Sequence, residues 1–173
     1  MVEPKKKAVH LDLGCESKAR PFCLPHTLDF NDCLQFLRNV RDFVTAHKDQ
    51  IKFYQTLHSY SQLILIPWGY TTQPAPGYDA MLDLGTRGYD ALHAVHGEFY
   101  EVGCIPCVLY TAAGTSLDWA LGVAGVPYVY SIELRDTGLY GFLLPADQII
   151  PTAEETWAFH VVAAQQMISE FGE

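Results

Sequence analysis

Two apolar runs limit the folds that are open to this chain. Residues 63–68 read LILIPW and residues 126–132 read VPYVYSI, and both have the length of a buried β-strand. Stretches with the three- and four-residue spacing of helices lie before, between and after these runs. Strands that alternate with helices predict an α/β fold, with a mixed sheet flanked by helices.

Apolar periodicity also predicts the individual elements. A first helix is expected from Asn31, with Asn31 or Asp32 as its N-cap, and a longer one over residues 78–96, although Gly85 and Gly88 are poor helix formers. The expected strands are residues 51–57, 63–66, 108–110 and 128–134, followed in the third case by a loop over 111–116 and a helical turn over 117–121. The first of these strands delivers His58 at its carboxyl end.

The last helix has the clearest sequence pattern. Residues 152–155 read TAEE, which is a capping box, and Pro151 precedes it. Five apolar residues then fall on one face at spacings of three and four: Trp157, Val161, Ala164, Ile168 and Phe171. An apolar face of this kind is typical of a helix that packs against a core.

Charge and composition argue against two classes of partner. The formal net charge is −9, so no nucleic-acid partner is expected, because phosphate binding needs clustered Lys and Arg. The only basic run, Lys5-Lys6-Lys7, is interpreted as a solvated terminal cluster. No apolar run approaches the roughly 18 residues of a membrane helix, so no membrane partner is expected. No apolar region follows the Lys cluster, so the chain as written has no export signal.

The cysteines give a weak signal. There are five, Cys15, Cys23, Cys33, Cys104 and Cys107, so at least one has no partner within the chain. Cys104 and Cys107 form a lone C-x-x-C, whereas a structural zinc site normally needs a second such pair. We therefore interpret Cys104 and Cys107 as small residues in a turn rather than as a metal or redox pair.

Three side chains of types that serve in catalysis or metal binding lie at or near predicted strand ends, where functional groups gather in open α/β sheets. They are His58, Tyr110 and Glu133. Glu133 is a carboxylate inside the β-rich run YVYSIEL, and a buried charge is costly unless it is paired, protonated or metal-bound. Arg135, two residues on, would point to the same face of an extended strand. A structural Glu133–Arg135 ion pair is therefore the alternative to catalysis, and a hydrogen-bonded structural role is the alternative for His58.

Other histidines do not complete a metal site by pattern. His26 and Asp29 form H-x-x-D, and His93 and His96 form H-x-x-H, a spacing that can place two ligands on one helical face. Nothing else in the sequence supports either pair. Gly-rich phosphate loops, nucleophile elbows and H-E-x-x-H motifs do not occur in the sequence.

Four stretches together resemble the zinc metallocarboxypeptidases of the carboxypeptidase A/B family. They are LHSYSQLILIPWGY (57–70), HGEFYEVG (96–103), YTAAGTSLDWA (110–120) and IELRDTGLYGFLLPADQIIPTAEETW (132–157). The resemblance runs from about Arg38 to about Ile168 and covers the C-terminal part of the catalytic domain. It implies a zinc-dependent peptidase that acts on the C-terminus of a peptide or protein.

The resemblance assigns roles to individual residues. His58 matches the last of three protein zinc ligands, and Glu133 matches the general base and acid that handles the proton of the attacking water. Tyr110 matches a mobile tyrosine that closes over the substrate carboxylate. Ser59, Tyr60 and Phe142 match residues that line the substrate cleft. The resemblance also implies cis peptide bonds at Ser59–Tyr60, Pro67–Trp68 and Arg135–Asp136.

Leu117 matches the base of the pocket for the C-terminal side chain. A carboxypeptidase for basic residues is expected to carry an acidic residue there. Leu117 therefore implies a preference for an apolar or aromatic C-terminal residue.

The chain also departs from the family pattern. The family takes its first two zinc ligands from an H-x-x-E motif well upstream of HSYSQ, and no H-x-x-E precedes His58. We expect residues 1–37 to be an unrelated or irregular leader and residues 38–173 to be a partial catalytic domain without the N-terminal strands. The alternative function is a truncated, catalytically incompetent fragment or pseudo-enzyme. The family is typically secreted, so an extracellular location is expected by resemblance.

Overall fold

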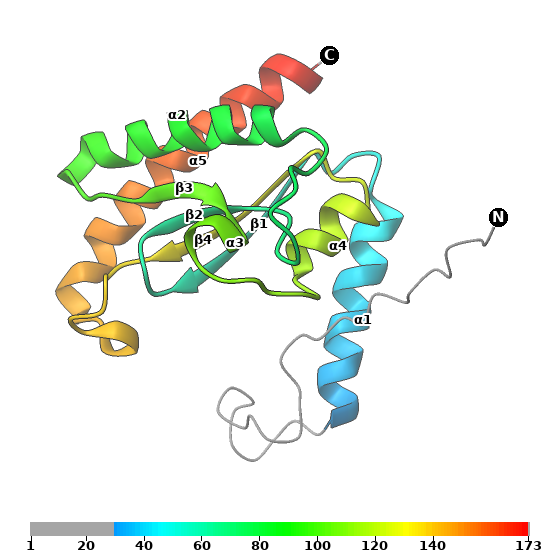
Figure 1. Ribbon diagram of the computed structural model, residues 1–173, viewed down its shortest axis with the longest axis horizontal. Helices are drawn as coiled ribbons and strands as arrows, with labels where there is room; N and C mark the ends of the chain where they lie inside the picture. The colour runs from blue at the N-terminus through cyan, green and yellow to red at the C-terminus, as the bar shows by residue number, and fades with distance from the viewer. Residues whose placement is uncertain (1–29, 173) are drawn as a thin grey trace.

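The computed structural model describes residues 30–172 and contains one mixed four-stranded sheet with helices around it (Figure 1). The elements in chain order are α1 (Phe30–Ala46), β1 (Phe53–Ser59), β2 (Leu63–Ile66), α2 (Tyr78–His96), β3 (Glu101–Cys104), α3 (Ile105–Val108), α4 (Ser116–Gly122), β4 (Tyr128–Leu134), the short 3₁₀ helices η1 (Gly141–Leu143) and η2 (Ala146–Gln148), and α5 (Ile149–Phe171). The α/β class, the helix over 78–96 and the strands over 63–66 and 128–134 are confirmed.

Some sequence features lie outside the described residues. These are the Lys5–Lys7 cluster, Cys15, Cys23, the His26/Asp29 pair and the side chain of Cys33. Within residues 30–172, no helix combines the length and the apolar character that a membrane span requires.

The sheet order is β1-β4-β2-β3. β1 and β4 run parallel, β2 and β3 run parallel, and β2 is antiparallel to β4, so the sheet is mixed as predicted. The register of β1 with β4 places His58 opposite Glu133 and Thr56 opposite Ser131. On its other side, β4 places Glu133 opposite Leu63.

The two faces of β4 meet different helices. The Tyr130 hydroxyl donates to the Met81 carbonyl of α2 at 2.7 Å, and its ring meets Phe159 of α5 at a centroid distance of 5.8 Å. Side chains alternate along a strand, so Ser131 and Glu133 point to the opposite face. Helix α4 packs against β4 and β1 and lies across the sheet from α2 and α5 (Figure 1).

The strand predicted over residues 108–110 is wrong. The strand is β3, Glu101–Cys104, and the next four residues form the single helical turn α3. Pro106 lies in the first turn of α3, where a proline is well tolerated, and the Leu109 N–H donates to the Ile105 carbonyl at 2.9 Å. Tyr110 consequently lies in a loop rather than at a strand end. Cys104 and Cys107 are joined by a disulfide across this turn, which corrects their interpretation as simple turn residues.

Two predictions for the last helix are also wrong. α5 begins at Ile149, so Thr152 lies inside the helix and its hydroxyl donates to the Gln148 carbonyl at 2.7 Å instead of capping. The predicted apolar face is largely exposed, since Trp157 is 69% and Ile168 71% exposed. The helix turns its other side inward, where Glu155 and Phe159 are fully buried.

Gly85 and Gly88 allow α2 to pack closely. A Cβ on Gly88 would lie 2.4 Å from the Phe159 ring of α5, and one on Gly85 would lie 3.0 Å from a methyl group of Val102. The two residues that weakened the helix prediction are therefore the positions where α2 approaches α5 and the sheet.

Gly88→Ala is expected to destabilise the protein by about 1–3 kcal/mol, because overpacking against Phe159 exceeds the roughly 1 kcal/mol that alanine gains in a helix. Denaturant unfolding measures this change. Asp90→Ala, on the exposed side of the same helix, is the control and should change stability little. A Gly88→Ala protein at least as stable as the wild type would contradict the packing argument.

Candidate active site

His58 and Glu133 lie side by side at the carboxyl ends of two neighbouring strands. They are register partners on parallel strands, so both side chains project from the same sheet face. His58 is exposed and Glu133 is half-buried. Burial raises the pKa of Glu133 above its ordinary value, and the neighbouring His58 partly offsets this rise. The site therefore places an imidazole beside a carboxylate whose pKa is higher than that of a surface glutamate.

Arg135 is not the partner of Glu133. β4 ends at Leu134, so strand alternation no longer aligns residue 135 with Glu133. The guanidinium turns instead to the fully buried Glu155 of α5: Nε donates to Oε2 at 3.0 Å, and Nη2 donates to Oε1. The alternative reading of Glu133 as half of a Glu133–Arg135 ion pair is therefore wrong.

Two small polar residues, Thr56 and Ser131, lie on the same sheet face as His58 and Glu133. Ser131 is buried, and Thr56, its register partner on β1, has a buried hydroxyl oxygen with no hydrogen bond among residues 30–172. Both share the face of His58 and Glu133 because each is two residues before one of them. Alternation along β4 is enough to put Ser131 on this face, whereas Thr56 lies beside it because of the register of β1 with β4.

The turn after β4 is organised by Asp136, which entered the sequence predictions only through its expected cis bond with Arg135. Its carboxylate accepts backbone N–H bonds from Tyr140 at 2.7 Å and from Gly138 and Gly141 at 3.0 Å each. These bonds, that of Tyr140 first, lower the pKa of Asp136. Gly138 and Gly141 have φ of +117° and +58°, which residues other than glycine rarely adopt. The turn therefore requires the two glycines of the D-T-G-L-Y-G pattern.

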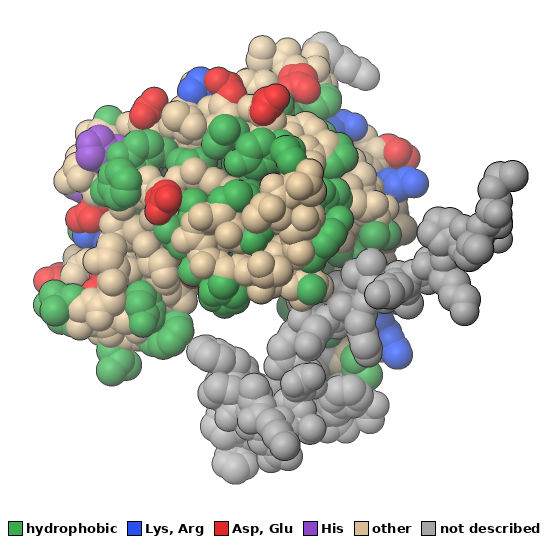
Figure 2. All heavy atoms as spheres, in the orientation of Figure 1, with side chains coloured by type: hydrophobic (Ala, Val, Ile, Leu, Met, Phe, Trp, Pro, Cys, Tyr) green, Lys and Arg blue, Asp and Glu red, His purple; other side chains and the backbone are tan. Residues whose placement is uncertain are grey.

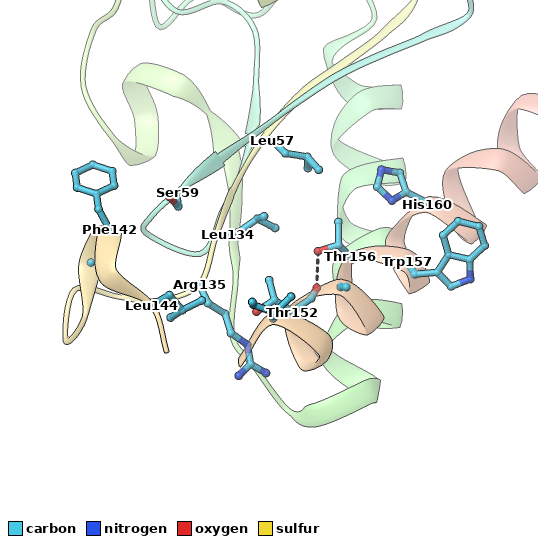
Figure 3. Close-up of a pocket in the computed structure, with 13 residues that line it drawn as sticks. Leu57, Ser59, Leu134, Arg135, Phe142, Leu144, Thr152, Thr156, Trp157 and His160 are labelled. Carbon is cyan, nitrogen blue, oxygen red and sulfur yellow. Dashed lines mark hydrogen bonds between the residues drawn. The ribbon is translucent and has the colours of Figure 1, made fainter. Parts of the chain in front are cut away.

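Three of the residues predicted to line the cleft lie around this turn. The rings of Tyr60 and Phe142 meet edge to face at 5.1 Å. Ser59 and Phe142 line a cavity of about 430 Å³ between β1, β4 and α5 (Figure 3). The cavity opens on the Leu57 side of β1, and neither His58 nor Glu133 lines it. The structure thus separates Ser59 and Phe142 from the face that carries His58 and Glu133.

Tyr110 and Leu117 flank the loop before α4. Tyr110 is 65% exposed, whereas Leu117 is 3% exposed and belongs to the core. The loop is fixed to Gly69, whose N–H donates to Asp118 Oδ1 at 2.8 Å and whose carbonyl accepts from Ala112 N–H at 2.8 Å. Burial raises the pKa of Asp118. No hydrogen bond or ion pair within residues 30–172 links Tyr110 or Leu117 to Glu133.

The described residues alone do not fit a zinc ion. Residues 30–172 hold no group of three or more His, Cys, Asp or Glu side chains that could bind a metal. His93 and His96, the H-x-x-H pair, make structural contacts. His93 Nδ1 lies 2.9 Å from the Glu98 carbonyl oxygen, and His96 contacts Glu154 and Glu155 of α5. His58 is therefore a lone candidate ligand in the described part.

Comparison with known proteins identifies the family. A family model described as zinc carboxypeptidase matches residues 34–159. This chain belongs to the zinc carboxypeptidase family. Carboxypeptidase B of Astacus astacus is 54% identical over 121 residues, which are 70% of this chain and 40% of that protein. Carboxypeptidase A1 of Mus musculus is 48% identical over 121 residues, which are 70% of this chain and 28% of that protein.

Solved structures share the fold. Bovine thrombin-activatable fibrinolysis inhibitor, in complex with tick carboxypeptidase inhibitor, matches with a TM-score of 0.74 and 32% identity over 77% of this chain and 45% of that chain. Carboxypeptidase A from Helicoverpa armigera matches with a TM-score of 0.68 and 28% identity over 78% of this chain and 34% of that chain. The chain therefore spans less than half the length of these carboxypeptidases.

The zinc carboxypeptidase resemblance also predicted three cis peptide bonds. The bonds at Ser59–Tyr60, Pro67–Trp68 and Arg135–Asp136 are all cis, which confirms this prediction. The names of the relatives include both A-type and B-type carboxypeptidases, so the names do not decide the side-chain preference of this chain.

Proposed function

We propose that this chain carries part of a carboxypeptidase site that removes a C-terminal apolar or aromatic residue from peptides. The observation that carries this proposal is the register pairing of His58 with Glu133 at the carboxyl ends of β1 and β4. In this proposal residues 38–173 belong to the catalytic domain, and residues 1–37 are a leader. An extracellular location is proposed on family membership, and the Cys104–Cys107 disulfide is consistent with an oxidising compartment.

Glu133 acts as general base and then as general acid in this proposal. Its carboxylate accepts a proton from the attacking water and delivers it to the leaving amine. A base works best with a pKa near the working pH, and burial moves the pKa of Glu133 in that direction. Arg135 does not hold Glu133 in a structural ion pair, because its guanidinium is bound to Glu155.

We propose His58 as one zinc ligand of the site. Catalytic zinc in proteins is held by three protein ligands. Residues 30–172 contain no such group, so two donors have to come from outside the described residues. Without those donors the chain is the catalytically incompetent fragment of the alternative reading.

The remaining site residues would recognise the substrate. Tyr110, in an exposed loop position, closes over the C-terminal carboxylate. Ser59, Tyr60 and Phe142 contact a part of the peptide away from the scissile bond, because Ser59 and Phe142 do not lie on the face of His58 and Glu133. Leu117 lies at the base of the pocket for the C-terminal side chain. An apolar residue there favours an apolar or aromatic side chain, because a basic side chain would lose its hydration without gaining an anion.

A chimera tests the function. In Astacus astacus carboxypeptidase B, the segment that matches this chain is replaced by the 121 matching residues of this chain. Paired peptides that end in Phe or in Lys are then supplied. The chimera is expected to release Phe with a kcat/KM at least about 100-fold above that for Lys, because an unpaired charge is excluded from an apolar pocket.

Residues 1–173 alone are the companion sample. They are expected to show neither stoichiometric tight zinc nor hydrolysis, because the described residues supply one candidate ligand. Tight zinc binding together with peptide hydrolysis by residues 1–173 alone would overturn the alternative that this chain is a catalytically incompetent fragment. Equal release of Phe and Lys by the chimera would overturn the role of Leu117, and an inactive but folded chimera would overturn the proposed function.

A further inference from the structure

The Cys104–Cys107 disulfide joins the end of β3 to the helical turn that precedes Tyr110. Cys104 is the last residue of β3, and Cys107 lies in the short helix α3. Their Cα atoms are 5.1 Å apart, a separation that suits both a helical turn and a disulfide. The cysteines are three residues apart in sequence, so the bond fixes one turn and does not link distant parts of the chain.

The two cysteines differ in their access to solvent. Cys104 is 5% exposed, whereas Cys107 belongs to the exposed residues. Thiol–disulfide exchange begins when a thiolate attacks one sulfur of the bond, so access selects the sulfur that is attacked. Figure 2 shows apolar and uncharged atoms where α3 lies in Figure 1, with the acidic side chains of this face nearer its rim. A negatively charged thiolate can therefore approach Cys107 through neutral surface.

So short a disulfide contributes little to the stability of the whole fold. The entropy that a disulfide removes from the unfolded chain grows with the length of the closed loop, and this loop is very short. β3 is held independently by its pairing with β2 and by the buried side chains of Tyr100 and Ile105, which are 1% and 4% exposed. Reduction of the bond should therefore leave the fold intact. Exposed disulfides of this kind are the labile ones in proteins.

The turn itself depends on the disulfide more than the fold does. The Leu109 N–H donates to the Ile105 carbonyl at 2.9 Å and closes the turn. An isolated helical turn is marginal, because fixing its residues costs more than its first hydrogen bond returns. Val108 packs on Gly103, where a Cβ would lie 2.8 Å from a Val108 methyl group. Reduction would leave this packing in place and remove the covalent bond, so the Leu109 hydrogen bond becomes the weak point.

The Tyr110 loop begins at this weak point. After Leu109 the next backbone anchor is Ala112, whose N–H donates to the Gly69 carbonyl at 2.8 Å. Tyr110 and Thr111 lie between the two anchors, and no hydrogen bond to another residue within 30–172 holds either of them. Loosening of Leu109 therefore frees the upstream end of the segment that carries Tyr110, while its downstream end stays fixed.

We propose that the Cys104–Cys107 disulfide is a redox-modification site, which a dithiol reduces by attack on Cys107, and that its state sets the mobility of the Tyr110 loop. The C-x-x-C pattern alone did not favour a redox role, but the disulfide and the unequal exposure of its two cysteines do. The effect of the loop on substrate binding rests on the function proposed for Tyr110, whereas the redox site itself does not.

The exchange takes place in two steps. The attacking thiolate forms a bond to Cys107 Sγ as the bond between Cys107 and Cys104 breaks, and Cys104 leaves as a thiolate that takes up a proton. The second thiol of the reductant then displaces Cys107 from the mixed disulfide. The protein gains two electrons and two protons, and the dithiol is oxidised to a disulfide.

Reduction of folded residues 1–173 tests the site. The protein is treated with dithiothreitol and trapped with an alkylating reagent, and mass spectrometry of its peptides locates the labelled cysteines. We expect Cys104 and Cys107 to become labelled together while thermal unfolding of the reduced protein remains cooperative. Labelling that occurs only after urea has unfolded the chain would identify a structural disulfide and overturn the proposal.

Cys104→Ser and Cys107→Ser form a matched pair of variants. The first leaves the exposed Cys107 as a free thiol, and the second leaves the buried Cys104. Glutathione disulfide is expected to modify Cys107 at least about 10-fold faster than Cys104, because the rate of exchange depends on access to the sulfur. Equal rates in the two variants would overturn the assignment of Cys107 as the attacked sulfur.

Hydrogen exchange measures the loop without any need for zinc or catalysis. In the double variant Cys104→Ser/Cys107→Ser the Leu109 N–H is expected to exchange at least about 10-fold faster than in the oxidised protein. The Ala112 N–H is the internal control and should exchange as before, because its bond to Gly69 lies beyond the turn. Unchanged exchange at Leu109, or equal acceleration at Ala112, would overturn the control of the loop by the disulfide.

The chimera connects the site with the proposed function. The double serine variant of the chimera is expected to have a kcat/KM for a peptide ending in Phe at least about 5-fold lower, mainly through KM, because a more mobile loop holds Tyr110 over the substrate less often. An active chimera that is insensitive to the double substitution would overturn this control of Tyr110. A chimera that is inactive with its cysteines intact would overturn the proposed function, and exchange at Leu109 would still decide the redox proposal.

Discussion

Glu133→Gln in the chimera is expected to lower kcat by about 10²- to 10⁴-fold, which is the range that a positioned general base contributes. Glutamine keeps the size of the side chain but cannot accept the proton of the attacking water. Release of C-terminal Phe from a peptide measures the loss. KM should change little, because the substrate contacts proposed for Tyr110 and Leu117 remain.

The same substitution is expected to leave stability equal or higher at pH 7. Burial raises the pKa of Glu133 in the folded state, so the folded protein holds this proton more tightly than the unfolded chain does. The associated stability is fully present below the ordinary glutamate pKa and is lost as the pH rises through the elevated pKa. Glutamine never ionises, so thermal unfolding of the variant should lack this loss.

Glu101→Gln is the matched control, since Glu101 is an exposed carboxylate on β3. It should alter neither kcat nor thermal unfolding. A Glu133→Gln chimera with wild-type kcat would remove Glu133 from the reaction. A variant that loses both activity and stability would indicate a structural role instead.

Arg135→Met is expected to destabilise the protein by about 3–5 kcal/mol, because the buried Glu155 carboxylate loses its guanidinium partner and keeps only His96 Nδ1, at 2.9 Å. Glu155 is fully buried, and Arg135 donates two hydrogen bonds to its carboxylate. Arg135 also lies 3.5 Å from Glu98, so the loss reaches the segment before β3. Urea unfolding of residues 1–173 measures this change.

A surface pair provides the comparison. Arg87 and Asp83 form an ion pair at 2.9 Å on α2, with side chains 43% and 66% exposed, so Arg87→Met should cost about 0–1 kcal/mol. The double variant Arg135→Met/Glu155→Leu should recover more than half of the loss, because it removes the stranded charge. An Arg135→Met protein within 1 kcal/mol of the wild type would show that Glu155 is not dependent on Arg135.

Local patterns predicted the elements that depend on local forces. The strands over 63–66 and 128–134 and the helix over 78–96 have the predicted bounds, because alternation and helical spacing are properties of neighbouring residues. The strand predicted over 108–110 is wrong because residues 105–108 form a helical turn, in which Pro106 is tolerated, and Leu109 and Tyr110 follow it in a loop. The family resemblance supplied the three cis bonds, which no local pattern indicated.

Pairing between distant residues was beyond local patterns. Arg135 was assigned to Glu133 by strand alternation, but β4 ends one residue earlier and the guanidinium finds Glu155 on α5. The apolar face of α5 was expected to pack inward, but Phe159 against Gly88 and Glu155 against Arg135 orient the helix the other way. Each choice depends on contacts between segments far apart in the chain.

The family resemblance, the α/β class and the identities of the candidate site residues follow from the amino-acid sequence without any structure. HSYSQ and ELRDTGLYGFLLP carry His58 and Glu133 whatever the packing. Three features depend on the packing of distant segments: these two residues are register partners on one sheet face, Arg135 is bound to Glu155, and within residues 30–172 β1 pairs on one side only. Register and burial are set by the summed packing of distant segments, and no local spacing contains that sum.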